Sequence, residues 1–134
     1  DRSRGDGRPV TRSLQVLANG VRCHYLEAGS GPPLVLLHGT AIDSAALSYG
    51  PSLPLLAEHR HVMALDWPGY GLSERPSAVM SMDEYVSLLE AFLDAKGLSS
   101  AHLAGFSAAT ASMPGCPCRC CRTWRCAHRG SAAA

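Results

Sequence analysis

The fold that this sequence predicts depends most on the segment His102-Leu103-Ala104-Gly105-Phe106-Ser107-Ala108-Ala109-Thr110. A short apolar run ends there in Gly-x-Ser-x-small, which is the pattern of an elbow where a strand turns sharply into a helix with a serine at the bend. The bend strains the backbone of the serine, so the residues two before and two after it must be small. Gly105 and Ala109 occupy those positions, although glycine is the usual residue at the second of them. The motif also arises by chance, so its weight depends on the sequence that precedes it.

The totals place the chain among single-domain globular proteins. Its 134 residues are 46% hydrophobic and 17% charged, which suits a chain that buries one modest core. A net charge of +1 argues against a general nucleic-acid binder, and no run of 18 apolar residues could cross a membrane. The polar N-terminus lacks the apolar stretch of a secretory signal. We therefore expect a cytoplasmic location and neither a nucleic-acid nor a membrane partner.

Two compositions meet near Ser107. The first 103 residues contain 25 Leu, Val and Ile residues, whereas residues 104–134 contain none. Five of the six cysteines lie in the last 19 residues, and no Asp or Glu follows Asp94. We expect a polar, disordered lead-in over 1–13, a folded region over 14–110, and a disordered tail rich in Cys and Arg over 111–134.

Strand signals recur along the folded region. Asn19-Gly20 supplies the two positive φ angles of a type I′ turn, which predicts a hairpin between strands at 14–17 and 21–27. In the second strand, alternation places Cys23 in the core and His24 at the surface on the opposite face. Three further apolar runs are typical of strands covered on both faces: 34–37, 61–65 and 101–105.

Helix signals separate these strands. Residues 45–57 predict a helix, although Gly50-Pro51 and Pro54 interrupt it. The capping box at 81–84 predicts a second helix that runs to Lys96. A hairpin followed by alternating strands and helices predicts an α/β fold, with a mostly parallel sheet that has helices on both faces.

Polar motifs follow three of the predicted strands at their carboxyl ends. These motifs are His38-Gly39-Thr40, Asp66-Trp67-Pro68-Gly69-Tyr70-Gly71-Leu72-Ser73, and Gly105-Phe106-Ser107. Functional residues of such sheets lie at the carboxyl ends of the strands. We therefore expect the three motifs to meet at one edge of the sheet.

Together the motifs resemble the N-terminal half of the α/β-hydrolase family, in the branch of small esterases, epoxide hydrolases and C–C bond hydrolases. The resemblance extends over roughly residues 14–109 and is specific in spacing and order. It implies an α/β-hydrolase fold that is truncated after the elbow, a small-molecule substrate and no cofactor.

The resemblance assigns a role to each matching residue. Ser107 is the nucleophile that attacks a carbonyl carbon, and the backbone N–H groups of Thr40 and Ala108 form the oxyanion hole. A serine here, where dehalogenases and epoxide hydrolases have a carboxylate, points to esters, thioesters or C–C bonds. The supporting residues of the motifs are His38, Gly39, Asp66, Gly69, Gly71 and Gly105. Among them, we expect His38 to shape the oxyanion loop and Asp66 to fix the turn that follows it.

Neither the acid nor the base of the family's triad is identifiable. Both follow the serine in the family's chain order, yet no acidic residue follows Ser107 and the only later histidine is His128. Without a base, the serine hydroxyl stays protonated and is a poor nucleophile. We expect the chain as written to be inactive.

The tail has two competing interpretations. Cys118-x-x-Cys121 with Cys126-x-His128 offers zinc-ligand residue types, but the separations are shorter than in finger or ribbon patterns, so we assign no metal. The abrupt replacement of Leu and Val by Cys and Arg instead indicates a frameshift near residues 108–113. Translation in the other two frames tests this hypothesis, and finding no apolar periodic sequence there contradicts it.

Three functions are compatible with these observations. The chain is a serine hydrolase, a non-catalytic fragment that keeps the scaffold, or a small metal- or partner-binding protein that uses its tail. The strand at 101–105 would lie unpaired at the sheet edge, which predicts self-association through that edge.

Overall fold

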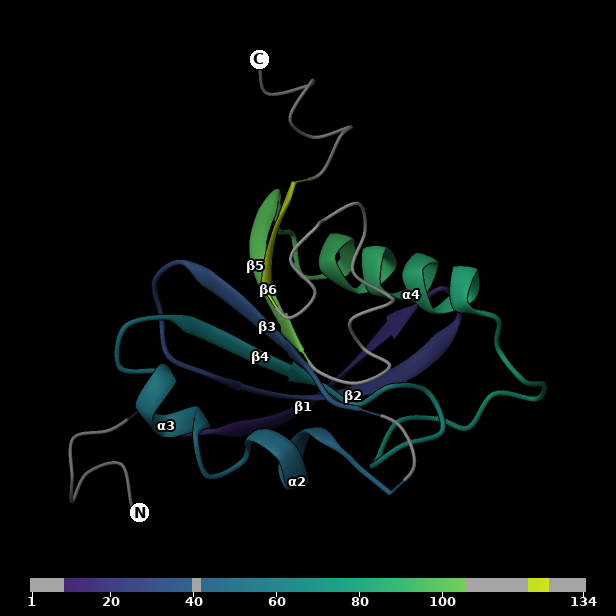
Figure 1. Ribbon diagram of the computed structural model, residues 1–134, viewed down its shortest axis with the longest axis horizontal. Coiled ribbons are helices and arrows are strands. Elements are labelled where there is room, and N and C mark those ends of the chain that lie inside the picture. Colours follow the sequence, from purple (N-terminus) through teal and green to yellow (C-terminus); the bar gives the residue numbers. More distant parts are fainter. Residues whose placement is uncertain (1–8, 40–41, 106–120, 126–134) are drawn as a thin grey trace.

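One six-stranded sheet, with the strand order β1-β2-β4-β3-β5-β6, organises the part of the chain that the structure describes (Figure 1). The structure is a computed structural model that describes residues 9–39, 42–105 and 121–125, the last of these by their backbone. The strands are β1 (Arg12–Ala18), β2 (Val21–Ala28), β3 (Pro33–Leu37), β4 (His61–Leu65), β5 (Ser100–Gly105) and β6 (Cys121–Arg125). The helices are α2 (Ala45–Tyr49), α3 (Leu53–Leu56) and α4 (Met82–Ala95).

The N-terminal hairpin is confirmed. Asn19 and Gly20 have φ angles of 52° and 77°, as a type I′ turn requires. Strand β1 begins at Arg12, two residues inside the predicted lead-in. Strand β2 pairs with β1 on one side and with β4 on the other, both antiparallel. The prediction that His24 lies at the surface is wrong: it is only 5% exposed, because Asp66, Ser13 and α2 cover that face of β2 at this position.

The parallel part of the sheet is confined to its three central strands. Strand β3 pairs parallel with β4 and with β5, whereas the other strand pairs are antiparallel. The sheet is therefore mixed: the N-terminal hairpin is antiparallel and the centre is parallel, as predicted, and the β2–β4 and β5–β6 pairs add further antiparallel pairing. The register places Leu37 opposite both Leu65 and Gly105, so the three central strands end level with one another.

Strand β5 is not the edge of the sheet. It pairs antiparallel with β6, with Ala101 opposite Trp124 and Ala104 opposite Cys121. The expectation of an unpaired strand at 101–105 is therefore wrong. The backbone groups of an apolar strand accept any segment that can extend beside them, and Thr and Trp favour extended structure. Self-association of the chain stays a prediction, although β5 is not the edge strand that it was expected to use.

The helices follow their start and stop signals. In place of one helix over 45–57, the chain forms α2 and α3, which are separated by residues 50–52. The capping box of α4 is confirmed, since the Ser81 hydroxyl accepts from the Glu84 N–H while the Glu84 carboxylate accepts from the Ser81 N–H. Within the described ranges, no helix is long and apolar enough to cross a membrane.

Two hydrophobic cores lie on the two faces of the sheet. Alternate residues of the central strands divide between them: Val35 and Leu37 face the core beneath α4, and Leu36 faces the core with α2 and α3. Helix α4 and the pair α2–α3 lie on opposite sides of the sheet (Figure 1). The α/β arrangement with helices on both faces is therefore confirmed.

A cluster of polar side chains surrounds Glu27, whose own side chain is only 6% exposed. Its carboxylate pairs with Arg12 Nη2 at 3.0 Å, with Lys96 Nζ at 3.0 Å and with His61 Nε2. Lys96 Nζ also donates to the hydroxyl of Tyr25 at 2.8 Å. Burial opposes the charged form, but the hydrogen bonds from His61 and Lys96 outweigh it and hold the pKa of Glu27 below its ordinary value.

We expect Glu27→Gln to lower the free energy of unfolding by about 1.5 kcal/mol at pH 7. This value is at the lower end for hydrogen bonds to a charged group, because Arg12 is exposed and His61 is partly exposed. Since folding lowers the pKa of Glu27, this contribution is fully present above the unfolded-state pKa of about 4.3 and is lost as the pH falls through the folded-state value. Urea denaturation of both proteins at pH 7, 5 and 4 checks this. A difference that grows on acidification contradicts it.

Candidate active site

Two of the three predicted motifs meet at the carboxyl ends of the central strands. His38 follows β3 and Asp66 follows β4, directly after the paired residues Leu37 and Leu65. Gly105, the first residue of the third motif and the last of β5, lies level with them because it pairs with Leu37. Thr40, Ser107 and Ala108 lie outside the described residues.

The His38 ring is buried, and both of its nitrogens form hydrogen bonds within the protein. The backbone N–H of Trp67 donates to Nε2 at 3.1 Å, so Nε2 is the unprotonated nitrogen. Nδ1 then carries the proton and donates to the Gly39 carbonyl at 2.6 Å. The indole N–H of Trp67 in turn donates to the His38 carbonyl at 3.0 Å. This arrangement favours the structural role predicted for His38, since it ties the end of β3 to the end of β4.

Asp43 holds the loop between β3 and α2. Its carboxylate accepts from the Gly39 N–H at 2.9 Å, from the Ser44 N–H at 2.8 Å and from the Ser48 hydroxyl at 2.6 Å. Burial acts to raise the pKa of Asp43, but these hydrogen bonds outweigh it and lower the pKa. Asp43 therefore stays ionised and fixes the loop on both sides of residues 40–41.

The end of β3 has one further anchor. The hydroxyl of Tyr49, a half-buried residue, donates to the Leu37 carbonyl at 2.8 Å. Burial, together with the nearby charge of Asp43, raises the pKa of Tyr49 to about 12. The phenol is therefore protonated at neutral pH and remains a hydrogen-bond donor to the strand end.

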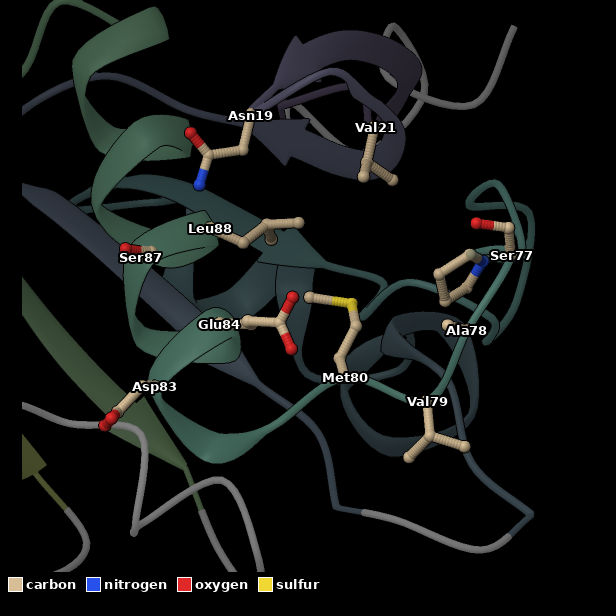
Figure 2. A pocket seen from close by; sticks show the side chains of 11 residues that line it. Asn19, Val21, Ser77, Ala78, Val79, Met80, Asp83, Glu84, Ser87 and Leu88 are labelled. Atoms are coloured by element: carbon tan, nitrogen blue, oxygen red, sulfur yellow. The ribbon is translucent and has the colours of Figure 1, made fainter.

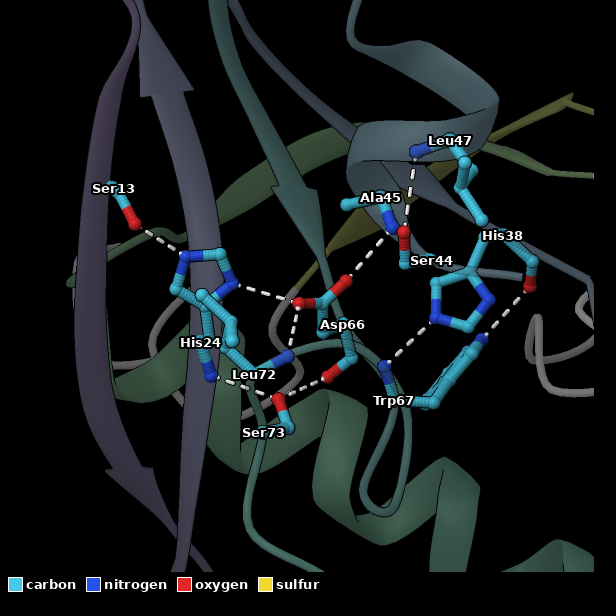
Figure 3. A network of polar contacts seen from close by, with 10 residues as sticks. All are labelled: Ser13, His24, His38, Ser44, Ala45, Leu47, Asp66, Trp67, Leu72 and Ser73. Carbon is cyan, nitrogen blue, oxygen red and sulfur yellow. Dashed lines mark hydrogen bonds and ion pairs between the residues drawn. The ribbon is translucent and has the colours of Figure 1, made fainter. Parts of the chain in front are cut away.

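Asp66 is the centre of the polar network (Figure 3). Its carboxylate is buried and accepts three hydrogen bonds: from the Ala45 N–H to Oδ1 at 2.7 Å, and from the Leu72 N–H and His24 Nδ1 to Oδ2 at 3.0 and 2.7 Å. The three donors come from the start of α2, from the turn after β4 and from β2. One carboxylate therefore joins three segments that are distant in the sequence.

The turn after β4 is built around the same side chain. Ser73 donates its hydroxyl to the Asp66 carbonyl at 2.6 Å. Gly71 has a φ angle of 53°, and a Cβ there would lie 2.1 Å from Asp66 Oδ2. Gly69, with a φ angle of 85°, donates its N–H to the Glu74 carbonyl at 2.9 Å. The role predicted for Asp66, to fix the following turn, is thus visible in its contacts, and Gly71 is required because no side chain fits there.

Two residues of this network, His24 and Asp43, were not predicted as part of the site. His24 could have been found from the prediction that helices cover both faces of the sheet, because an inner strand then has no surface side. Asp43 carries the weaker signal of an acidic residue just before the helix-capping residue Ser44. Neither residue belongs to the motifs from which the site was predicted.

Two hollows flank the segment 76–80, next to the start of α4. The one in Figure 2 has a volume of about 460 Å³ and is lined by Asn19, Val21, residues 76–80 and the first turns of α4. Its Glu84 carboxylate already caps the helix, and the hydrogen bonds to Ser81 lower the pKa of that carboxylate. The other hollow reaches residues 68–70 and Tyr85. Neither includes His38 or Asp66, so neither is assigned to the chemistry at the strand ends.

A metal site needs several ligating side chains close together, and side chains are described for residues 9–39 and 42–105. No group of three His, Cys, Asp or Glu residues in that part of the chain could hold a metal ion. The cysteines of the proposed zinc pattern lie where no side chain is described. The zinc interpretation of the tail therefore stays untested.

Comparison with known proteins relates the chain to one large family. The sequence model of the alpha/beta hydrolase fold matches residues 32–112. The (E)-2-((N-methylformamido)methylene)succinate hydrolase of Acinetobacter baylyi is 34% identical over 98 residues, which are 73% of this chain and 36% of that enzyme. The 2-hydroxy-6-oxo-2,4-heptadienoate hydrolase of Pseudomonas putida is 34% identical over 69% of this chain and 34% of its own length.

Solved structures agree with the sequence comparisons. The 2-hydroxy-6-oxo-6-phenylhexa-2,4-dienoate hydrolase of Rhodococcus superposes with a TM-score of 0.73 at 28% identity, over 78% of this chain and 40% of that one. Epoxide hydrolase A of Mycobacterium thermoresistibile gives a TM-score of 0.66 at 34% identity, over 72% and 31% of the two chains. The chain spans about a third of the length of the curated relatives it matches.

Proposed function

Because the chain belongs to the α/β hydrolase fold family, we propose that it carries the nucleophile and the oxyanion hole of a serine hydrolase. Ser107 attacks the carbonyl carbon of a small ester, thioester or C–C bond substrate, and the N–H groups of Thr40 and Ala108 stabilise the oxyanion that forms. The observation that supports this proposal most directly is that β3, β4 and β5 end level, so that His38, Asp66 and Gly105 lie at one edge of the sheet.

The relatives include hydrolases that cleave different kinds of bond, and the residue at the elbow distinguishes these classes. Hydrolases of dienoate substrates, a haloalkane dehalogenase and an epoxide hydrolase all match this chain. A hydroxyl at the elbow, where the last two groups use a carboxylate, places the proposal with acyl transfer and C–C cleavage.

The proposal includes an incomplete triad. No acidic residue follows Ser107 in this sequence, and His128 is the only later histidine. Catalysis by the oxyanion hole alone leaves rates orders of magnitude below those of a triad enzyme. Added imidazole can act as an external base in place of the missing one.

Labelling of the purified chain with a fluorophosphonate probe tests the proposal. We expect slow labelling in buffer and clearly faster labelling with imidazole, since a base must take the proton of the Ser107 hydroxyl. Both are expected to disappear in Ser107→Ala and to persist in Ser87→Ala, a matched change at an exposed serine of α4.

Two outcomes contradict parts of this proposal. Equal labelling of wild type and Ser107→Ala excludes Ser107 as the nucleophile. Fast, Ser107-dependent labelling without imidazole shows that a base is supplied from elsewhere, which contradicts the incomplete triad while leaving the nucleophile in place.

A further inference from the structure

His24 is a buried histidine that no predicted motif includes. It lies on β2, on the face that α2 covers, and is 5% exposed. Its Nδ1 lies 2.7 Å from Asp66 Oδ2, and its Nε2 lies 2.5 Å from the hydroxyl of Ser13 on β1. Because an ionised carboxylate can only accept, Nδ1 carries a proton in this pair.

The backbone around His24 holds it in place against Asp66. The Asp66 N–H donates to the His24 carbonyl at 3.0 Å. The His24 N–H donates to the Ser73 hydroxyl at 2.8 Å, and that hydroxyl donates to the Asp66 carbonyl. Together with the side-chain pair, these contacts join His24, Ser73 and Asp66 in a closed set of hydrogen bonds (Figure 3).

Of the two donors to Asp66 Oδ2, His24 is the one fixed by the sheet. Leu72 belongs to an exposed turn and is itself 69% exposed. His24 belongs to an inner strand, paired on both sides. The direction of the carboxylate, and with it the position of Oδ1 beneath the Ala45 N–H, therefore depends on the imidazole more than on the turn.

We propose that His24 is a positioning residue for the loop between β3 and α2. Its Nδ1–H orients the carboxylate of Asp66, and Asp66 Oδ1 in turn fixes the Ala45 N–H, at the point where the loop enters α2. Trp67, the neighbour of Asp66, fixes the other end through His38. The loop contains Thr40, so the importance of this positioning for function rests on the oxyanion role proposed above. Its effect on the structure of the loop does not.

Two conservative variants separate the two ring nitrogens. In His24→Asn the amide nitrogen falls near the position of Nδ1 and can still donate to Asp66, whereas in His24→Gln it falls nearer Nε2 and Ser13. We expect amide hydrogen exchange at Ala45 and Leu72 to become about tenfold faster in His24→Gln, as the loss of one hydrogen bond implies, and to stay near wild type in His24→Asn. Exchange in β3 should not change in either variant. His59→Asn, at an exposed histidine, is the matched control.

If His24 only stabilises the fold as a whole, its replacement gives a different pattern of amide exchange. Unchanged exchange at Ala45 in His24→Gln overturns the proposal, and so does an equal acceleration at all amides, which reports global destabilisation. Equal effects of His24→Asn and His24→Gln overturn the role of Nδ1. If the variants do not fold, ¹⁵N-histidine spectra of the wild type decide: protonation at Nδ1 supports the proposal, and a ring protonated at Nε2 alone overturns it. None of these readouts requires Ser107 to react, so failure of the labelling experiment and failure of this one reject different claims.

Discussion

Replacing Asp66 with alanine is expected to lower the free energy of unfolding by about 3–5 kcal/mol, as measured by urea denaturation. Asp66 is 2% exposed, and its carboxylate accepts hydrogen bonds from Ala45, Leu72 and His24. Its removal leaves two backbone N–H groups and a buried imidazole without an acceptor, and each such group costs about 1–3 kcal/mol. Glu90→Ala, which removes an exposed carboxylate from α4, is expected to change the stability by less than about 0.5 kcal/mol.

A double-mutant cycle with Gly71 shows whether the loss arises at this carboxylate. A methyl group at position 71 meets Asp66 Oδ2 at 2.1 Å, so Gly71→Ala displaces the same carboxylate and adds the strain of a positive φ angle. Once Asp66 is alanine, the collision is gone and only the strain is left. We expect the double variant to be more stable than the sum of the single effects predicts. Additive losses, or a loss below about 1 kcal/mol for Asp66→Ala, contradict the central position of Asp66.

Phe92→Ala is the second change with a large expected effect, about 3–5 kcal/mol by the same denaturation measurement. The ring is 0% exposed in the core beneath α4 and lies edge-on to Tyr25 on β2, with centroids 5.3 Å apart. Truncation removes the contact between the helix and the hairpin and leaves a cavity that the rigid sheet cannot fill. Because the chain buries only a modest core, we expect its cooperative transition to weaken as well.

An exposed leucine provides the control for Phe92. Leu47 on α2 is 67% exposed, so Leu47→Ala is expected to stay within about 0.5 kcal/mol of wild type. If both substitutions cost the same, α4 does not pack on the sheet as described. Such a result would also mean that α4 does not support the hairpin, whose strand β2 carries His24.

Local signals predicted much of the fold. Asn19-Gly20 encodes its turn because both residues accept positive φ angles. The Ser81–Glu84 capping box fixes the start of α4 through hydrogen bonds between residues three apart. The strands β3, β4 and β5 were recognised as apolar runs, and the alignment of their ends followed from the topology of parallel strands. In each case the determining interaction lies within a few residues or follows from a general rule.

The features that were missed depend on long-range partners. From its strand alone, His24 is expected at the surface, because the residues that cover it, Asp66 and those of α2, lie far from it in the sequence. Strand β6 comes from a segment without aliphatic residues, and its pairing depends on the open backbone groups of β5 more than on its own composition. Asp66 is recognisable as part of a motif, but its contacts with Ala45 and His24 join residues 21 and 42 positions away.

The most direct test of this account is the measurement of contacts between neighbouring strands by NMR. The proposed site requires that β3, β4 and β5 end level, so that His38, Asp66 and the residues after Gly105 leave the sheet at one edge. We predict interstrand nuclear Overhauser effects that pair Leu37 with both Leu65 and Gly105, and Val35 with Met63 and Leu103. A register shifted by one residue would turn each side chain of the shifted strand to the other face of the sheet and separate the motifs. Such a shift would contradict the site from which the function is proposed.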